Sequence, residues 1–270
     1  MNNAPIGIFD SGLGGLSVLR EIRALLPQES LIYVADSKYA PYGEKPEQFV
    51  EARTLQVCEW LVAQGCKALV IACNTATMHA VQTLREKLAL PIVGVEPGLK
   101  PAAAASRSKV VGVLATGNTL KSAKFGRLLA SLEGESRFLC EAGVGLVPLI
   151  EQGDVDGPAV REKLTTYLSP MLEAGADTLV LGCTHYPFLS DTVRELVGDR
   201  LKLVDTGDAI ARQLQRKLAE HDMAANADAV PNDRYTSTKD AAHLRAMAAA
   251  LLHVDTPAET LVIEPAPAFD

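Results

Sequence analysis

The sequence predicts an α/β fold made of two similar, doubly wound lobes with mostly parallel sheets. Short runs rich in Val, Ile and Leu alternate with segments of helical period, as in chains built of βα units. Glycine and proline punctuate the joins between these segments, at positions such as Pro27, Gly65 and Gly175. The chain also resembles itself at a nearly constant spacing, which indicates that one lobe is a duplicate of the other.

Eight apolar segments have the length and composition of buried strands, and in chain order they are residues 6–10, 31–35, 68–73, 91–96, 110–115, 137–141, 178–183 and 201–205. Helical periodicity between them predicts helices over Leu16–Leu26, Gln48–Val62 and Ala159–Leu172. The polar, proline-containing stretch Ala224–Asp233 is expected to be a loop.

Two pairs of segments carry the internal repeat. "ALVIACNTAT" matches "TLVLGCTHYP", and this alignment places Cys73 on Cys183, 110 residues later. "IGIFDSG" matches "VGVLATG" at an offset of 105 residues. Either pair alone suits two unrelated α/β strands, but two pairs in the same order favour a duplication.

The repeat predicts where the chain passes from one lobe to the other. We expect a first lobe of residues 1–97 and 208–270, and a second lobe of residues 98–207. A pseudo-twofold axis would relate the lobes, and the active site would lie in the cleft between them.

Composition limits the class of protein. The chain has 270 residues and a net charge of -7, and it shows no cluster of Lys and Arg that would bind nucleic acid or an anionic membrane. We find neither a basic leader nor an apolar stretch near the ~20 residues of a membrane span, so we expect a cytoplasmic protein. The five cysteines form no C-x-x-C pair, which argues against a disulfide framework and a four-cysteine zinc site.

Polar side chains collect just after the predicted strands. In doubly wound sheets, ligands bind beyond the carboxyl ends of the strands, where loops lead into helices. The residues at these ends are Asp10, Ser11 and Gly12, residues 36–43, Cys73, Asn74 and Thr75, then Thr116 and Thr119, and finally Cys183, Thr184 and His185.

The segment "GLGGLS", residues 12–17, invites comparison with a dinucleotide-binding loop, with Asp36 as the acid that binds ribose. However, Ser17 stands where the third glycine belongs, and Asp10 would aim a carboxylate at the pyrophosphate. The glycines are better explained as a tight turn, either without a ligand or with N–H groups that bind a small anion such as a carboxylate.

The matched cysteines are the main chemical signal. Cys73 alone is readily explained as an inert buried thiol. A thiol just before a helix, however, feels the positive end of the helix dipole, which favours the thiolate. If the lobes face each other, Cys73 and Cys183 would pair as a disulfide, hold zinc together with His185, or act on opposite faces of one substrate. A racemase needs the last arrangement, because it removes a proton from one face of a carbon and returns one to the other.

Four motifs resemble those of the cofactor-independent glutamate racemases, within the aspartate/glutamate racemase superfamily. They are "FDSGLGGLSV", "PYG" at residues 41–43, "CNTAT" at residues 73–77 and "GCTHYPFL" at residues 182–189. Further likeness in "VEPGLKPA", "TLKS" and "PLIE" extends the resemblance over nearly the whole chain.

The resemblance implies that Cys73 and Cys183 are the acid–base pair, one deprotonating L-glutamate and the other D-glutamate. Asp10 is expected to orient Cys73 or manage its proton, and His185 to do so for Cys183, unless His185 is a structural histidine. Glu151 resembles a family acid near the second thiol.

Fixed hydrogen-bond donors around the substrate carboxylate would stabilise the carbanion that forms beside it. The expected substrate-binding residues are Asp10, Ser11, Pro41, Tyr42, Gly43, Asn74, Thr75, Thr116, Thr119, Thr184 and His185. Residues 41–43 resemble a family substrate-binding segment, and the alternative is that Tyr42 is only a packed turn aromatic.

The resemblance implies a reaction that needs neither cofactor nor metal and that supplies D-glutamate for peptidoglycan. Its small-molecule partner is glutamate, and the resemblance is compatible with a homodimer. Three alternatives stay open: a racemase of aspartate or another amino acid, a zinc hydrolase built on two cysteines and a histidine, and a binding protein without catalysis.

Overall fold

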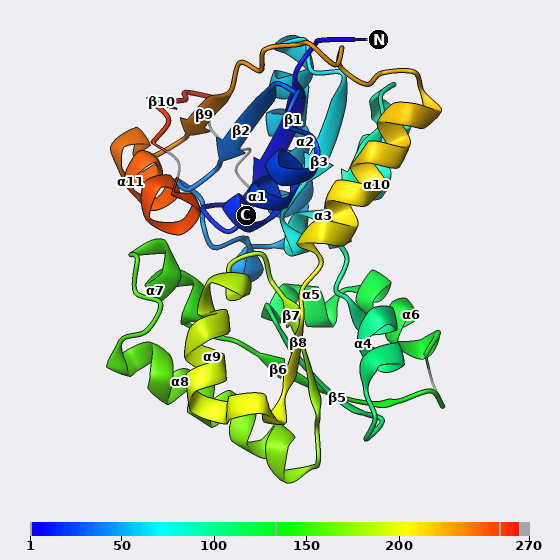
Figure 1. Ribbon diagram of the computed structural model, residues 1–270, viewed down its shortest axis with the longest axis vertical. Helices are drawn as coiled ribbons and strands as arrows, with labels where there is room; N and C mark the ends of the chain where they lie inside the picture. Colours follow the sequence, from blue (N-terminus) through cyan, green and yellow to red (C-terminus); the bar gives the residue numbers. More distant parts are fainter. Residues whose placement is uncertain (1, 133, 254, 265–270) are drawn as a thin grey trace. The chain divides into compact units, whose positions relative to one another are not determined.

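The computed structural model describes residues 2–132, 134–253 and 255–264 and contains two parallel sheets with helices around them (Figure 1). The chain forms two compact units. The first holds the chain up to Val95 and again from Gly207, and the second holds Glu96–Thr206. The mixed α/β architecture with two parallel sheets agrees with the predicted fold class. That residues 1–97 with 208–270, and residues 98–207, are separate domains stays a prediction.

The first unit contains a six-stranded parallel sheet in the order β10-β9-β2-β1-β3-β4. The strands are β1 (Ile6–Asp10), β2 (Leu31–Ala35), β3 (Ala68–Ile71), β4 (Ile92–Gly94), β9 (Arg234–Ser237) and β10 (Ala258–Thr260). Every residue of β1, β2 and β3 is buried. Such continuously apolar strands are typical of a parallel sheet that helices cover on both faces.

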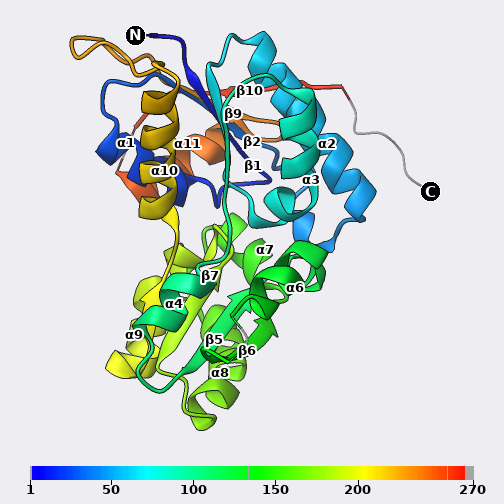
Figure 2. The same cartoon turned by 90° about the vertical axis from the view of Figure 1, so that its right-hand side faces the viewer.

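Helices pack on both faces of this sheet. Figure 2 shows α1 (Leu16–Leu25), α10 (Gly207–Glu220) and α11 (Ala241–Leu252) on one side, and α2 (Glu47–Ala63) with α3 (Asn74–Lys87) on the other. The second face holds a core of Phe9 and Ile71 from the strands, Val57 and Leu61 from α2, and Leu84 from α3. The short helix η1 (Tyr42–Glu44) lies between β2 and α2 in the chain.

The second unit contains a four-stranded parallel sheet in the order β6-β5-β7-β8. Its strands are β5 (Val110–Ala115), β6 (Arg137–Ala142), β7 (Thr178–Gly182) and β8 (Lys202–Val204). Its helices are α4 (Leu99–Ala105), α5 (Gly117–Lys121), α6 (Ala123–Ala130), α7 (Leu146–Glu151), α8 (Pro158–Glu173), η2 (Tyr186–Leu189), α9 (Ser190–Val197) and η3 (Gly198–Arg200). Side chains of α7, α8 and α9 form one core with Leu114, Leu179 and Leu181 of the sheet.

The two sheets share strand order and register. The order β2-β1-β3-β4 in the first unit corresponds to β6-β5-β7-β8 in the second. Ile6 of β1 pairs with Ala68 of β3, and Val111 of β5 pairs with Thr178 of β7. These four residues begin the segments that the sequence repeat aligned, so the structure supports the predicted duplication.

All eight expected strands are present, but several are shorter, and two strands were missed. The expected strand 68–73 ends at Ile71, because the chain turns there into α3. The missed strands, β9 and β10, have the short sequences RYTS and AET, which lack the apolar run that marks a buried strand. They lie at one edge of the sheet, where β9 pairs with β2.

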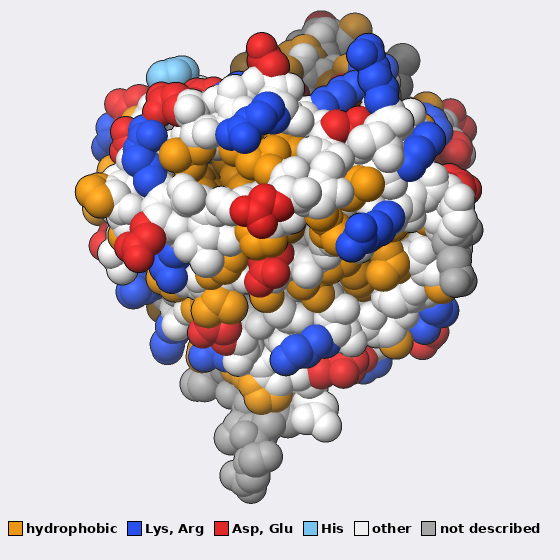
Figure 3. All heavy atoms as spheres, turned by 90° about the horizontal axis from the view of Figure 1, so that it is seen from below, with side chains coloured by type: hydrophobic (Ala, Val, Ile, Leu, Met, Phe, Trp, Pro, Cys, Tyr) orange, Lys and Arg blue, Asp and Glu red, His pale blue; other side chains and the backbone are white. Residues whose placement is uncertain are grey.

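The surface shows charges of both signs. On the face in Figure 3, patches of hydrophobic side chains alternate with single Lys, Arg, Asp and Glu side chains, and the described residues there form no continuous basic field. Among the described residues, no helix is both long enough and apolar enough to cross a membrane.

Candidate functional site

Cys73 lies between the end of β3 and the start of α3, where it caps the helix. Its backbone is extended, and its thiol accepts a hydrogen bond from the N–H of Ala76 at 3.5 Å. The helix dipole and this N–H both favour a negatively charged sulfur. The side chain is only 5% exposed, so the helix end acts on it with little screening by water.

The neighbouring strand brings two more predicted residues to Cys73. Phe9 of β1 pairs with Ile71 of β3, so Asp10, the last residue of β1, and Ser11, which follows it, lie beside the turn that carries Cys73. The hydroxyl of Ser11 lies 3.3 Å from the sulfur of Cys73. Asp10 is fully buried, and its carboxylate accepts a hydrogen bond from the N–H of Gly12 at 2.9 Å.

The turn expected to bind an anion therefore already contacts the carboxylate of Asp10. The structure also gives Asp36 a different partner from ribose: it forms a buried ion pair with Arg53 at 2.8 Å. Both observations argue against the dinucleotide interpretation of "GLGGLS".

Of the other predicted residues of the first unit, Asn74, Thr75 and Tyr42 are buried, and Pro41 and Gly43 are half-buried. Asn74 and Thr75 open α3, and both side chains are less than 5% exposed. Tyr42 opens η1, and its ring contacts Phe9. Residues 41–43 precede α2, and η1 contacts α3.

In the second unit, Cys183 belongs to a three-residue chain of contacts. Its sulfur lies 3.7 Å from Nδ1 of His185, and Nε2 of His185 lies 2.6 Å from Oε1 of Glu151. Glu151 ends α7, whereas the other two residues follow β7. Cys183 and His185 are buried, so these contacts are shielded from water.

The surroundings of His185 favour the imidazolium. Burial alone would lower the pKa of His185, but its hydrogen bonds with Cys183 and Glu151 and the negative charges of these partners raise that pKa well above its usual range.

Three predicted threonines lie near this second thiol in the chain or the sheet. Ala115 of β5 pairs with Gly182 of β7, so Thr116 and Cys183 follow neighbouring strand ends. The hydroxyl of Thr116 caps α5 and contacts that of Thr119 at 2.9 Å. Thr184 is buried directly between Cys183 and His185.

The structure adds Tyr186, beside Cys183, and Arg53, the partner of Asp36, to the residues that the sequence singled out. Burial and the charge of Cys183 raise the pKa of Tyr186 well above its usual range, and its hydroxyl donates to the carbonyl of Gly143. Tyr186 lies within the "GCTHYPFL" motif, which was the available signal. Arg53 gave no signal in the sequence, because its partner Asp36 belongs to a different element.

The remaining cysteines have different surroundings. Burial raises the pKa of Cys58 far above its usual range and that of Cys66 to about 12, which keeps both thiols protonated. Cys140 is exposed on β6. All five cysteines lie in the described part of the chain, and none forms a disulfide.

The zinc alternative needs several ligands around one point. The expected ligands were Cys73, Cys183 and His185, and of these the sulfur of Cys183 lies 3.7 Å from Nδ1 of His185. Across residues 2–132, 134–253 and 255–264, no group of three His, Cys, Asp or Glu side chains has an arrangement suited to a metal ion.

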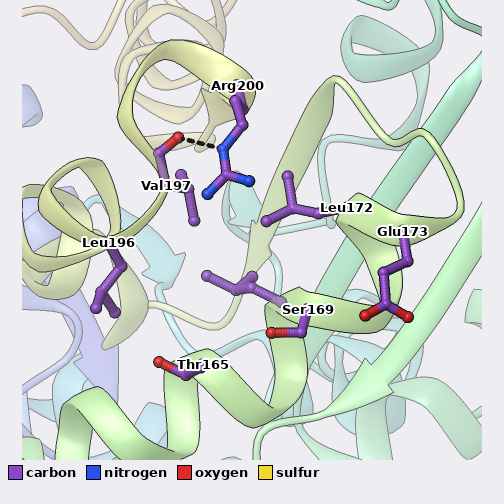
Figure 4. Close-up of a pocket in the computed structure, with 8 residues that line it drawn as sticks. Thr165, Ser169, Leu172, Glu173, Leu196, Val197 and Arg200 are labelled. Carbon is purple, nitrogen blue, oxygen red and sulfur yellow. Dashed lines mark hydrogen bonds between the residues drawn. The ribbon is translucent and has the colours of Figure 1, made fainter.

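A pocket elsewhere in the second unit contains none of the predicted site residues. It measures about 220 Å³ and lies between α8 and the segment formed by α9 and η3. Figure 4 shows Ser169 and Glu173 on one side and Arg200 on the other, where the Nε of Arg200 donates to the carbonyl of Val197. Nothing in this pocket connects it with the two cysteines.

The fold and the two cysteine clusters define a class: an α/β protein with duplicated parallel sheets and a buried thiol at the same strand end of each sheet. The sequence pattern of the Asp/Glu/hydantoin racemase family matches residues 6–214. The chain belongs to this family.

Individual relatives are similar over nearly their whole length. A glutamate racemase of Cupriavidus pinatubonensis is 79% identical over 269 residues, which cover 100% of this chain and 99% of that protein. The crystal structure of a Bacillus anthracis glutamate racemase isoform has a TM-score of 0.88 at 29% identity, covering 97% of this chain and 98% of that one. The Escherichia coli glutamate racemase in complex with L-glutamate and the activator UDP-MurNAc-Ala has a TM-score of 0.85 at 33% identity, covering 97% and 100%.

Proposed function

We propose that this protein is a glutamate racemase, an isomerase that interconverts L- and D-glutamate through two acid–base cysteines, Cys73 and Cys183. The proposal agrees with the names of its relatives. The observation that carries the mechanism is the equivalence of the two thiols, because each follows the corresponding strand of one of two sheets with the same order and register.

Racemisation requires proton transfer on both faces of the α-carbon. One thiolate removes the proton, and the opposite thiol donates a proton to the other face. The reverse reaction exchanges the two roles, so both cysteines must reach either protonation state. The proposal requires the two strand ends to face a shared cleft that holds the substrate.

The two thiols have different local partners for this task. Cys73 has the helix N-terminus and the hydroxyl of Ser11 beside it, and Asp10 ends the neighbouring strand β1. Cys183 has the imidazole of His185, which Glu151 contacts from the other side. We assign Asp10 and His185 the task of orienting the thiols and managing their protons.

The carbanion places negative charge on the neighbouring carboxylate of the substrate. Donors that are already fixed stabilise this charge without reorganising, and they act more strongly on the transition state than on the ground state. We assign this role to the hydroxyls and amides at the strand ends, namely Ser11, Asn74, Thr75, Thr116, Thr119 and Thr184. Residues 41–43 would contribute to binding the side-chain carboxylate.

The product D-glutamate would supply peptidoglycan synthesis, and we place the activity in the cytoplasm, where the sequence predicts the chain to reside. All groups named above belong to one chain, so the mechanism does not require a homodimer. Light scattering on the purified protein measures the oligomeric state.

Replacing either catalytic cysteine tests the proposal. We expect Cys73→Ala and Cys183→Ala each to lower racemisation by about 10²–10⁴-fold or more. The fold should persist, because each change removes a single sulfur atom. Circular dichroism of a glutamate solution measures the activity, and Cys140→Ala, on an exposed strand position, is the matched control.

Two results would contradict the proposal. Full turnover in either single variant would exclude the two-base mechanism. Stoichiometric zinc in the purified protein, with activity lost to a chelator, would favour the zinc hydrolase instead.

Aspartate, tested as a substrate under the same conditions, should racemise far more slowly than glutamate.

A further inference from the structure

A buried ion pair anchors the turn formed by residues 41–43, and the proposed mechanism does not use it. Tyr42 is 1% exposed, and its hydroxyl donates to Oδ2 of Asp36 at 2.6 Å. The tyrosine ring contacts Phe9 and, edge-on, Phe49. The side chain of Tyr42 is therefore packed into the core, and these contacts fix the position of the turn.

Arg53 on α2 fixes the acceptor of this hydrogen bond. Its Nε donates to Oδ2 of Asp36 at 2.9 Å, and its Nη2 donates to Oδ1 at 2.8 Å. This paired geometry locks the plane of the carboxylate. Asp36 is fully buried and Arg53 is 1% exposed, so the ion pair is shielded from water.

The C-terminal part of the chain completes the anchor. The Nη1 of Arg53 donates to Oε1 of Gln56 and to the backbone carbonyl of Glu264, both at 2.7 Å. Leu261 and Ile263 pack against the same core as Tyr42. Residues from three distant parts of the sequence thus meet at one guanidinium.

The anchored turn lies close to the first thiol. Tyr42 and Cys73 belong to one hydrophobic cluster, and η1 contacts α3, the helix that Cys73 caps. We infer that Asp36 and Arg53 are positioning residues, which act through Tyr42 to fix the substrate-binding turn beside Cys73. This inference rests on the proposed function.

The inference predicts a defect in binding more than in chemistry. If the turn binds the side-chain carboxylate of glutamate, which does not react, its contacts are equally strong in the ground state and the transition state. Loss of such uniform binding raises KM and leaves kcat nearly unchanged. A merely structural role would lower stability without this separation of KM from kcat.

Tyr42→Phe is the sharpest variant, because it removes one hydroxyl and keeps both the ring packing and the ion pair. We expect KM for L- and D-glutamate to rise about tenfold, with kcat within about twofold of the unchanged protein. Tyr235→Phe is the matched control, since it removes a hydroxyl from another buried tyrosine, on β9 of the same unit, and it should leave KM unchanged.

Arg53→Lys is the second variant. Lysine keeps the positive charge but cannot make the paired contact with Asp36 or reach all four acceptors. We expect KM to rise at least as much as in Tyr42→Phe. Urea unfolding of each variant separates this effect from lost stability.

The failures of the two proposals can be distinguished. If the unchanged protein racemises glutamate but Tyr42→Phe keeps its KM, the inference is overturned while the proposed function stands. If kcat falls and KM stays constant, the turn acts in the chemistry and the positioning role is wrong. If the unchanged protein neither racemises nor binds glutamate, measured by calorimetry, both proposals fail.

Discussion

At the scale of single residues, the two matched cysteines have unlike partners. Cys73 contacts a hydroxyl and a backbone N–H, whereas Cys183 contacts an imidazole that a carboxylate supports. The sequence repeat predicted the equivalent positions of the sulfur atoms. The repeat alone did not predict the contact between His185 and Glu151, because Glu151 reaches His185 from α7, an element outside both aligned segments. The family resemblance had placed Glu151 near Cys183.

The variant Glu151→Gln tests whether the carboxylate of Glu151 acts on His185 through its charge. The change keeps the size of the side chain but removes the negative charge, so the pKa of His185 should fall from its raised value. We expect the decline of kcat/KM on the alkaline side to move to lower pH, as followed in a pH profile of racemisation. An unchanged profile would show that the charge of His185 does not limit the reaction.

The contact between His185 and Glu151 also makes the free energy of unfolding depend on pH. The pKa of His185 is raised in the folded protein, so its stabilising effect is complete below the unfolded value of about 6.5 and is lost as pH rises through the folded value. The difference in free energy of unfolding between the unchanged protein and Glu151→Gln should therefore be largest near pH 6 and shrink in alkaline solution. Urea titrations across this range measure it.

At the scale of elements, the turn between β1 and α1 depends on close approach. A Cβ on Gly15 would lie 2.6 Å from the Cβ of Asp10 and 3.0 Å from the hydroxyl of Tyr33. That hydroxyl donates to the carbonyl of Gly12 at 2.7 Å, so it fixes the same turn. The sequence showed that a tight turn was needed here, but the reason for glycine at position 15 comes only from the folded contacts.

Gly15→Ala should therefore disturb both stability and activity. Overpacking of this kind costs about 1–3 kcal/mol, and displacement of Asp10 should lower kcat as well. The matched control is Gly126→Ala in α6, where nothing lies near the added methyl group and alanine favours the helix. Thermal unfolding measures the stability of the two variants, and a racemisation assay measures their activity. Equal stability and equal activity of Gly15→Ala and Gly126→Ala would contradict this explanation of the turn.

Elements that carry apolar runs were predictable, and polar ones were not. The segments "IGIFD" and "TLVLG" form β1 and β7 as expected, because burial on both faces requires such sequences. β9 is a polar segment that the sheet stabilises by pairing with β2, and only the folded chain reveals that partner.

At the scale of the whole molecule, the first unit is discontinuous, and contacts at the amino ends of its strands join its parts. Lys67 and Glu29 form a buried ion pair at 2.6 Å. The other oxygen of Glu29 accepts the N–H of Ala225 at 2.8 Å, and Lys67 donates to the carbonyl of Asn2. This cluster ties the N-terminal segment and the returning chain to the sheet.

Glu29→Gln would leave the charge of Lys67 buried without its partner. The free energy of unfolding should fall by roughly 3–5 kcal/mol, while KM for glutamate should hold, since the cluster lies at the opposite strand ends from Cys73. Glu259→Gln, which breaks the exposed pair with Arg234, is the control and should change stability far less. Urea unfolding measures the loss of stability in each variant. Equal losses in Glu29→Gln and Glu259→Gln would show that the buried pair of Lys67 and Glu29 has no special role in stability.

The proposed racemisation requires proton transfer by two different groups on opposite faces of one carbon. Incubation of L-glutamate with the unchanged protein in D₂O, stopped early, tests this most directly by mass spectrometry of the separated enantiomers. The account predicts that the D-glutamate formed carries deuterium at the α-carbon while the remaining L-glutamate still carries hydrogen. D-glutamate that keeps the original proton would show that a single group moves it from face to face, and the two-cysteine mechanism would be wrong.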